Sequence, residues 1–189
     1  MLENNRFITG NILPGLPETY NVTVPGGLAE LKVMLYWNDP PAAAVASQTL
    51  VNNLDLEVIT PAPVSATVLP LILDTIPSNV GNSAQQGIDN INNVEQVVIK
   101  NPTGGDYTFR INPTNIAQNP SQEYYIVYDF VPLETKIVSP VGGETYLQGE
   151  NALVHWDSYG DPANTFTLDY SLDNGVNWTV LKNNVEAHR

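Results

Sequence analysis

Residues 31–58 carry the feature that most limits the fold, an alternation of apolar and polar side chains interrupted once by prolines. Four apolar side chains recur at every second position in the first half: Leu31, Val33, Leu35 and Trp37. A period of two is that of a half-buried β-strand. Pro40 and Pro41 end this strand, because proline has no N–H to donate to a ladder. The alternation resumes with Leu54, Leu56 and Val58 inward, so the segment predicts two core strands joined by a long loop.

The same period recurs between residues 7 and 132, whereas helix signals are almost absent. The 15 prolines and 13 glycines are spread along the chain. Further strands are predicted at Phe7–Ile12, Thr19–Val24, Val94–Asn101, Asp106–Pro113 and Gln122–Pro132, the last of them central because both its faces are apolar. Residues 61–93 form a long irregular loop with an apolar island at Val68–Leu73, and such loops usually have a function. We therefore expect an all-β fold, with a jelly-roll-type β-sandwich over residues 1–132.

The chain changes character at residues 133–136. Short alternating stretches are now separated by glycines, and Asp173-Asn174-Gly175 suits a hairpin turn because asparagine and glycine tolerate positive φ. The pattern predicts an immunoglobulin-like β-sandwich over residues 133–189. About five strands fit in this length, whereas a complete immunoglobulin sandwich has about seven. We therefore expect a truncated domain with unpaired strand edges, which should lead either to strand contacts between copies of the chain or to disorder beyond Lys182.

Charge and composition exclude several classes of protein. The chain has 20 acidic and 7 basic residues, a net charge of −13, and so lacks the basic surface that nucleic acids require. It has no cysteine, which excludes disulfides, zinc–thiolate sites and thiol nucleophiles. No apolar run reaches the length of about 18 residues that spans a membrane. Met1–Gly10 lacks the basic and apolar regions of a signal peptide, and we expect that Met1 is not the natural start.

Four short motifs follow one another over about 80 residues, at a spacing that is fairly specific. They are W-x-D-P at Trp37–Pro40, L-V-N-x-L-D-L at Leu50–Leu56, N-N-V-E-Q-V at Asn92–Val97 and N-P-x-x-G-x-Y-T at Asn101–Thr108. In these motifs the chain resembles the β-sandwich domain that follows the catalytic domain in secreted bacterial subtilisin-like serine proteases. That domain is related in position and architecture to the P-domain of proprotein convertases. Residues 139–181 look like the immunoglobulin-like modules attached to many secreted bacterial enzymes.

The resemblance implies a secreted, non-catalytic accessory domain. Its partner would be the upstream protease catalytic domain, which it would stabilise or whose access to protein substrates it would shape. The subtilase strings H-G-T-H and G-T-S-M-A do not occur in this chain. A serine nucleophile needs a nearby base, but His155 reads as an exposed strand residue and His188 lies at the terminus. Asp55 and Glu57 face outward without a groove, which argues against a glycosidase pair.

Calcium is the cofactor that the residues and the resemblance favour. Five oxygen-bearing side chains at strand ends are the candidate ligands: Asp39, Asn53, Asp55, Asn93 and Glu95. Ca²⁺ takes oxygen ligands, related protease domains carry calcium in this region, and Asp74 and Asp89 of the long loop could add to the set. The competing interpretation is that Asp39, Asn53 and Asp55 cap turns through side-chain hydrogen bonds.

The alternative function is a carbohydrate- or surface-binding module. Six aromatic residues could form a sugar platform or could simply pack in the core: Tyr36, Tyr124, Tyr125, Tyr128, Trp156 and Trp178. A domain that docks on a protease should expose an apolar patch, whereas a sugar binder should expose coplanar rings around a polar groove. A structural spacer, the third possibility, would show neither.

Overall fold

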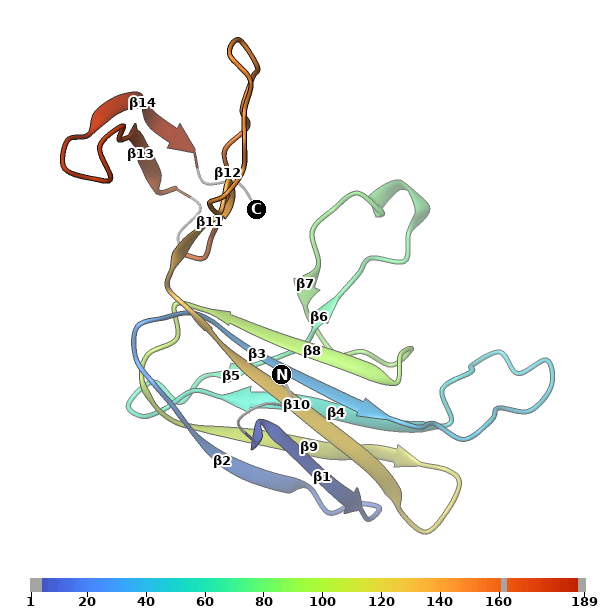
Figure 1. Ribbon diagram of the computed structural model, residues 1–189. Helices are drawn as coiled ribbons and strands as arrows, with labels where there is room; N and C mark the ends of the chain where they lie inside the picture. Colours follow the sequence, from blue (N-terminus) through green and yellow to red (C-terminus); the bar gives the residue numbers. More distant parts are fainter. Residues whose placement is uncertain (1–4, 161–162, 187–189) are drawn as a thin grey trace. The chain divides into compact units, whose positions relative to one another are not determined.

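The computed structural model describes residues 5–160 and 163–186, and these residues form an all-β protein, as the sequence predicted (Figure 1). The chain divides into two compact units, Met1–Val131 and Pro132–Arg189. The longer strands of the first unit are β1 (Phe7–Ile12), β2 (Glu18–Val24), β3 (Leu28–Trp37), β4 (Asn52–Ile59), β8 (Val94–Lys100), β9 (Gly105–Ile116) and β10 (Gln122–Pro132). All seven overlap the strands predicted from the alternation.

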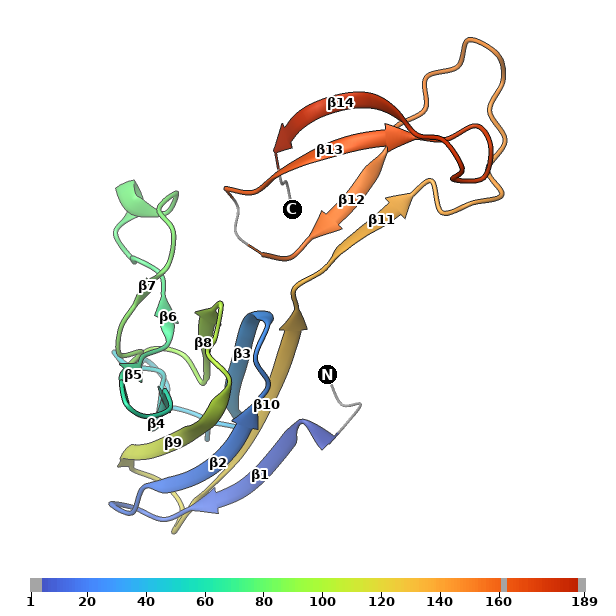
Figure 2. The same ribbon diagram turned by 90° about the vertical axis from the view of Figure 1, so that its left-hand side faces the viewer.

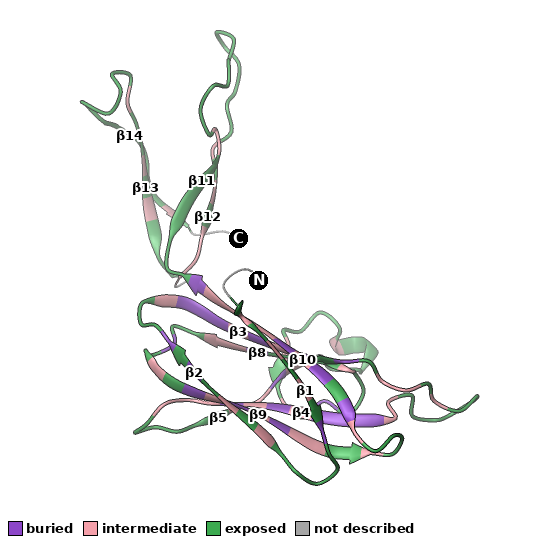
Figure 3. Ribbon diagram, turned by 60° about the horizontal axis from the view of Figure 1, so that its bottom comes forward, coloured by how far each residue is buried: buried purple, intermediate pink, exposed green. Residues whose placement is uncertain are grey.

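The first unit is a β-sandwich of two four-stranded sheets. One sheet has the order β1-β10-β3-β8 and the other the order β2-β9-β4-β5, with β5 at Thr67–Val68. The predicted inward residues of β3 and β4 are fully buried between the sheets (Figure 3): Leu31, Val33, Leu35, Trp37, Leu54, Leu56 and Val58. β10 lies between β1 and β3, which confirms that it is an interior strand.

Tyr124 ties the two sheets together at the β1 side of the sandwich. It comes from β10, and its hydroxyl bonds the hydroxyl of Tyr20 on β2 at 2.8 Å and the carboxylate of Glu18. The ring lies over Gly10 of β1, where an added Cβ would stand 2.3 Å from the tyrosine oxygen. Only glycine at this position leaves room for the ring.

The segment between β4 and β8 is more ordered than the long loop that we expected. Its apolar island forms β5, which extends a sheet, and β6 (Leu71–Ile72), which pairs with β7 (Gln85–Gln86). A 3-10 turn, η2 (Pro77–Asn79), lies between β6 and β7. The hairpin of β6 and β7 stands beside β8, on the side away from β3 (Figure 2).

The second unit contains four described strands in two antiparallel pairs. β11 (Thr135–Ser139) pairs with β12 (His155–Ser158), and β13 (Thr165–Tyr170) pairs with β14 (Thr179–Glu186). None of its described residues is fully buried. Five apolar side chains, half-buried except for the exposed Ile137, line a cavity of about 130 Å³ within this unit: Ile137, Trp156, Phe166, Leu168 and Val185.

The turn predicted at Asp173-Asn174-Gly175 is present in the hairpin of β13 and β14. Asn174 and Gly175 have positive φ values of 55° and 87°, and the N–H of Val176 donates to the carbonyl of Asp173 at 3.4 Å. The connection between the strands, residues 171–178, is longer than this turn alone, and within it Asp173 accepts hydrogen bonds from the backbone and side chain of Asn177, at 2.8 and 2.6 Å. β14 continues to Glu186, so of the two expected outcomes, strand contacts between copies or disorder beyond Lys182, residues 183–186 do not show the second; residues 187–189 lie outside the described residues.

Within residues 5–160 and 163–186, no helix is long and apolar enough to cross a membrane.

Candidate functional site

Three of the four sequence motifs meet at one corner of the sandwich, where β3 ends and β4 and β8 begin. The indole N–H of Trp37 donates to the carbonyl of Asn52 at 2.9 Å. The side-chain amide of Asn93 donates to the carbonyl of Trp37 at 2.8 Å. These bonds join the motifs at residues 37–40, 50–56 and 92–97, although the motifs lie far apart along the chain.

Asp39 and Asn93, two of the five candidate ligands, have structural partners in this corner. The carboxylate of Asp39 accepts hydrogen bonds from the backbone N–H groups of Val51 and Asn52, both at 2.8 Å. It therefore caps the loop that leads into β4, as the alternative interpretation of the sequence held for Asp39. Asn93 holds the end of β3 through its bond to Trp37.

Glu95 bridges the two sheets at the edge where β4 and β8 approach one another. One of its oxygens, Oε2, accepts a hydrogen bond from the backbone N–H of Leu56 at 2.6 Å. The residue is 2% exposed, and the other oxygen, Oε1, has no hydrogen-bond partner. Burial raises the pKa of Glu95 to about 8; the Leu56 bond opposes this shift, and the charges of Asp55 and Asp89 add to it.

Asn53 and Asp55 of β4 carry two more buried oxygens without a hydrogen-bond partner, and the charge of Asp55 acts on Glu95. Oδ2 of Asp55 accepts a hydrogen bond from the hydroxyl of Thr114, while its Oδ1 is buried without a partner. Burial raises the pKa of Asp55 above its usual range. Asn53 donates to Oδ1 of Asn90 at 2.9 Å, and its own Oδ1 is buried without a partner. The register of β4 shifts between Asn53 and Leu54, and such bulges re-aim side chains.

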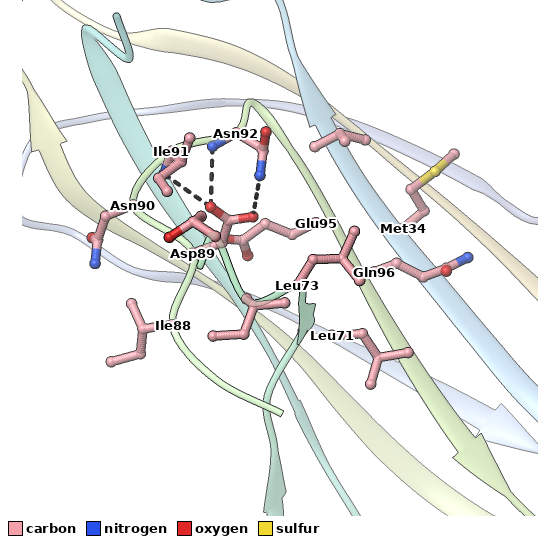
Figure 4. A pocket seen from close by; sticks show the side chains of 13 residues that line it. Met34, Leu71, Leu73, Ile88, Asp89, Asn90, Ile91, Asn92, Glu95 and Gln96 are labelled. Carbon is pink, nitrogen blue, oxygen red and sulfur yellow. Dashed lines mark hydrogen bonds between the residues drawn. The ribbon is translucent and has the colours of Figure 1, made fainter. Parts of the chain in front are cut away.

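The loop residues Asp74 and Asp89 both cap turns of their own. Asp74 is exposed and bonds the N–H of Ile76 at 2.9 Å and the side chain of Asn79 at 2.7 Å. Asp89 is 8% exposed and accepts three bonds, from the N–H of Ile91 and from the N–H and side-chain amide of Asn92 (Figure 4). Of the two, Asp89 contributes charge to the surroundings of Asp55 and Glu95.

The chemistry of the unsatisfied atoms fits a hard cation, since two carboxylates and one amide offer only oxygen. In the part of the chain that the structure describes, however, no group of three or more His, Cys, Asp or Glu side chains is arranged to hold a metal ion. A buried acceptor without a donor costs about 1–3 kcal/mol. The three residues with such an oxygen are Asn53, Asp55 and Glu95, which we call the oxygen cluster.

A second feature is an aromatic row on the outer face of the β1-β10-β3-β8 sheet, formed by Phe7, Tyr125 and Tyr36. The ring centroids are 6.0 Å apart for Phe7 and Tyr125 and 6.3 Å apart for Tyr36 and Tyr125, with interplanar angles of 22° and 27°. Phe7 and Tyr36 are each 41% exposed. Phe7 was not among the aromatic residues predicted from the sequence, although the alternation in β1 places it on the outward face.

The remaining aromatic and histidine candidates do not join this row. Tyr124 is buried and Tyr128 packs edge-on against Phe109. In the second unit Trp156 is half-buried, and Trp178 is exposed. His155 is exposed on β12, as predicted, while His188 lies outside the described residues. Glu57, which the sequence argued against as a glycosidase partner of Asp55, forms an ion pair with Arg110 on β9.

The first unit is a β-sandwich with polar, oxygen-bearing side chains at one corner. Comparison with known proteins finds a similarity to a protein that is named as a serine protease. The chain is 28% identical over 154 residues to the serine protease/ABC transporter B family protein tagA of Dictyostelium discoideum. The match covers 82% of this chain but 8% of the length of that protein. No protein-family model matches the chain. The similarity points to a protease-associated domain.

Proposed function

We propose that this chain is a non-catalytic accessory region of a secreted subtilisin-like serine endopeptidase. The observation that carries the proposal is the similarity of 82% of the chain to a protein named as a serine protease. The motifs at residues 37–108 support the same assignment by their resemblance to domains that follow subtilisin-like catalytic domains. The region stabilises the catalytic domain or shapes the access of protein substrates to it.

The aromatic row is the surface proposed for docking on the catalytic domain. Its rings are partly exposed on the outer face of a sheet, and Val127 and Met34 extend the apolar face around them. Apolar area of this kind on a β-sandwich is typical of a surface that another domain covers. Each buried ring would contribute on the order of 1.5–3 kcal/mol to the contact.

The test uses the natural protein that contains this region. We expect its reading frame, upstream of the residue 1 codon, to encode the subtilase aspartate, histidine and serine motifs. In that full-length protein, Phe7→Ser combined with Tyr125→Ser should lower the temperature at which protease activity is lost. Val64→Ser, at a position that is 75% exposed on a loop, is the matched control and should leave it unchanged.

Three results would contradict the proposal. The first is a reading frame without protease motifs. The second is an inactivation temperature that the double variant leaves unchanged. The third is saturable binding of glycans that depends on Tyr36 and Tyr125, which would favour the carbohydrate-binding alternative.

We also propose that the oxygen cluster binds Ca²⁺ through Asn53, Asp55 and Glu95. Calcium would satisfy the three partnerless oxygens and keep both carboxylates ionised. It should raise the melting temperature of the protein, and Asp55→Asn with Glu95→Gln should remove that increase. Glu144→Gln, an exposed change in the second unit, is the control. A melting temperature that millimolar calcium leaves unchanged would overturn this assignment.

A further inference from the structure

The outer edge of β8 is open. β8 is the last strand in its sheet, so within residues 5–160 and 163–186 no strand is hydrogen-bonded to the edge that faces away from β3. In an antiparallel ladder, a strand that lacks one neighbour leaves N–H and C=O groups unpaired along that side. The nearby β6 is paired with β7 and leaves this edge unused.

Two hollows follow one another along this edge. One has a volume of about 560 Å³ and is lined by Val94, Glu95 and Gln96 at the start of β8. The second, of about 850 Å³, is lined by Val98, Ile99 and Lys100 at its end. Leu71 of β6 lines both hollows. The hairpin and β8 therefore bound one groove, which we call the β8 groove, on the scale of a ligand site.

The walls of the β8 groove expose large apolar side chains to water. Leu73, Ile88 and Ile91 are 71%, 59% and 60% exposed, and all three line the first hollow (Figure 4). Apolar surface gathered in a groove marks an interaction site more often than a stable free surface. An occupant with apolar side chains would remove this surface from water.

The two ends of the groove differ in charge. The carboxylate of Asp89 lies at the Val94 end, whereas Lys100 lies at the other end. An acidic end on a chain of net charge −13 favours a basic group in its partner.

We propose that the β8 groove binds an extended polypeptide strand from another molecule. The backbone of that strand pairs with β8, its alternate apolar side chains enter the two hollows, and a lysine or arginine lies at the Asp89 end. Strand addition to an open sheet edge is a common mode of peptide recognition, in which the backbone bonds supply affinity and the pockets supply specificity. That the strand comes from a protease substrate rests on the proposed function; the binding itself does not.

The probe is a fluorescein-labelled peptide of about nine residues, a usual strand length. It alternates valine and threonine and carries one lysine near one end. The whole chain, in EDTA to keep the carboxylates free of metal, should bind it with saturation at one site. Backbone amides of Val94–Lys100 should become protected from hydrogen exchange. N-methylation of one alternate set of peptide amides should abolish binding, because it removes the hydrogen bonds to β8 and leaves the side chains in place.

One protein variant and its control test the apolar walls of the groove, and a change in the peptide tests the charge. Leu73→Asp, at a side chain that is 71% exposed and therefore compatible with folding, should weaken binding at least about tenfold. Val64→Asp, 75% exposed and outside the groove, is its control and should bind as the parent chain does. Replacing the peptide lysine with glutamate should weaken binding further than replacing it with glutamine.

Several outcomes would overturn the inference. They are an absence of binding, binding that N-methylation or Leu73→Asp leaves unchanged, and protection of β1 in place of β8. Protection of β8 in the peptide-free protein, together with a dimer in sedimentation, would replace the peptide with a second copy of the chain. None of these results bears on the protease reading frame, so a failure here is distinct from a failure of the proposed function.

Discussion

The two units of this protein use the same secondary structure but protect their apolar residues very differently. The first unit encloses a core of 16 clustered buried side chains between its two sheets. In the second unit no described residue is fully buried, and Leu147, Leu153 and Trp178 are each more than half exposed. Alternating sequence is enough to form β-ladders, but a second, well-matched layer is needed to bury what the ladders carry.

The two units also place their acidic groups differently. Glu95 of the first unit is buried, and its pKa is raised to about 8. Asp173 of the second unit is exposed, and hydrogen bonds led by the backbone N–H of Asn177 lower its pKa to about 2. Burying the carboxylate of Glu95 therefore lowers the stability of the first unit when this group is ionised, whereas the exposed carboxylate of Asp173 orders a loop in the second unit.

The largest difference should appear when a tryptophan is removed from each unit. Trp37→Ala deletes a fully buried side chain and should lower the free energy of unfolding by about 3–5 kcal/mol. Trp178→Ala removes a side chain that is 63% exposed and should change it by less than about 1 kcal/mol. Urea unfolding of both variants measures the contrast. Equal losses would mean that the second unit has a core of comparable quality.

Gly10→Ala tests the close contact that holds the first sandwich together. The new Cβ would meet the ring of Tyr124 and should destabilise the protein by about 1–3 kcal/mol. Gly81→Ala is the matched control, because no atom lies within 4 Å of a Cβ at that position. Thermal unfolding should separate the two variants. A Gly10 variant as stable as the Gly81 variant would show that Tyr124 can move aside at little cost.

Glu95→Gln tests the buried carboxylate through its pH dependence. The pKa of Glu95 is 4.5 in the unfolded chain and about 8 in the folded one. The folded state therefore binds more protons between these values, so stability is greatest below pH 4.5 and falls as pH rises toward 8. Glutamine keeps an acceptor for the N–H of Leu56 and carries no charge, so the variant should be more stable than the parent by about 1–2 kcal/mol at pH 8.

The measurement is urea unfolding of the metal-free protein from pH 4.5 to pH 8.5. The advantage of the variant should grow with pH and vanish near pH 4.5. If calcium is added, the order should reverse, because an ion in the oxygen cluster would stabilise the ionised parent and not the variant. An advantage that is constant over this range would contradict the raised pKa.

The smallest expected effect belongs to Asp173 in the second unit. Its pKa is lowered, so the order that it brings to the loop should be present above pH 3.8 and be lost as pH falls toward 2. Asp173→Asn should speed hydrogen exchange at the N–H of Asn177 at neutral pH and leave the unfolding of the first unit unchanged. Exchange as slow as in the parent would show that the loop is held by other bonds.

The sequence predicted the first sandwich well because the side chains that alternate along its strands are the ones that are buried in the structure. The alternation in Leu31–Trp37 and Leu54–Val58 follows which side chains face the core, and this pattern is local. The hairpin of β6 and β7 was missed because each of its strands has only two residues, too few for a period. In the second unit the hairpin turn at Asn174 and Gly175 was predicted, whereas the pairing of β11 with β12 and the length of the loop around Asn174 were not.

The candidate site was predictable in its residue types and not in its hydrogen bonds. The motifs named Asp39, Asn53, Asp55, Asn93 and Glu95 as polar groups at strand ends, and the structure places them around the ends of β3, β4 and β8. Which oxygens are occupied depends on backbone atoms of other strands, such as the N–H of Leu56 for Glu95. These partners lie 39 residues apart in the chain, and sequence periodicity carries no information about such a contact.

The pairing of β1 with β10 sets how the first unit would respond to mechanical load. The strands are antiparallel, with Phe7 opposite Val127, so the start of β1 lies at the same end of the pair as the finish of β10. Tension that draws its two ends apart would peel β1 away one hydrogen bond at a time, instead of shearing all of them together. Arg6 stands at the start of that peel, where it bonds Asp129 at 2.5 Å and covers the ring of Phe130 at 4.4 Å. The contacts of Arg6 with Asp129 and Phe130 are the first to bear the force, and after they break, β10 remains paired with β3.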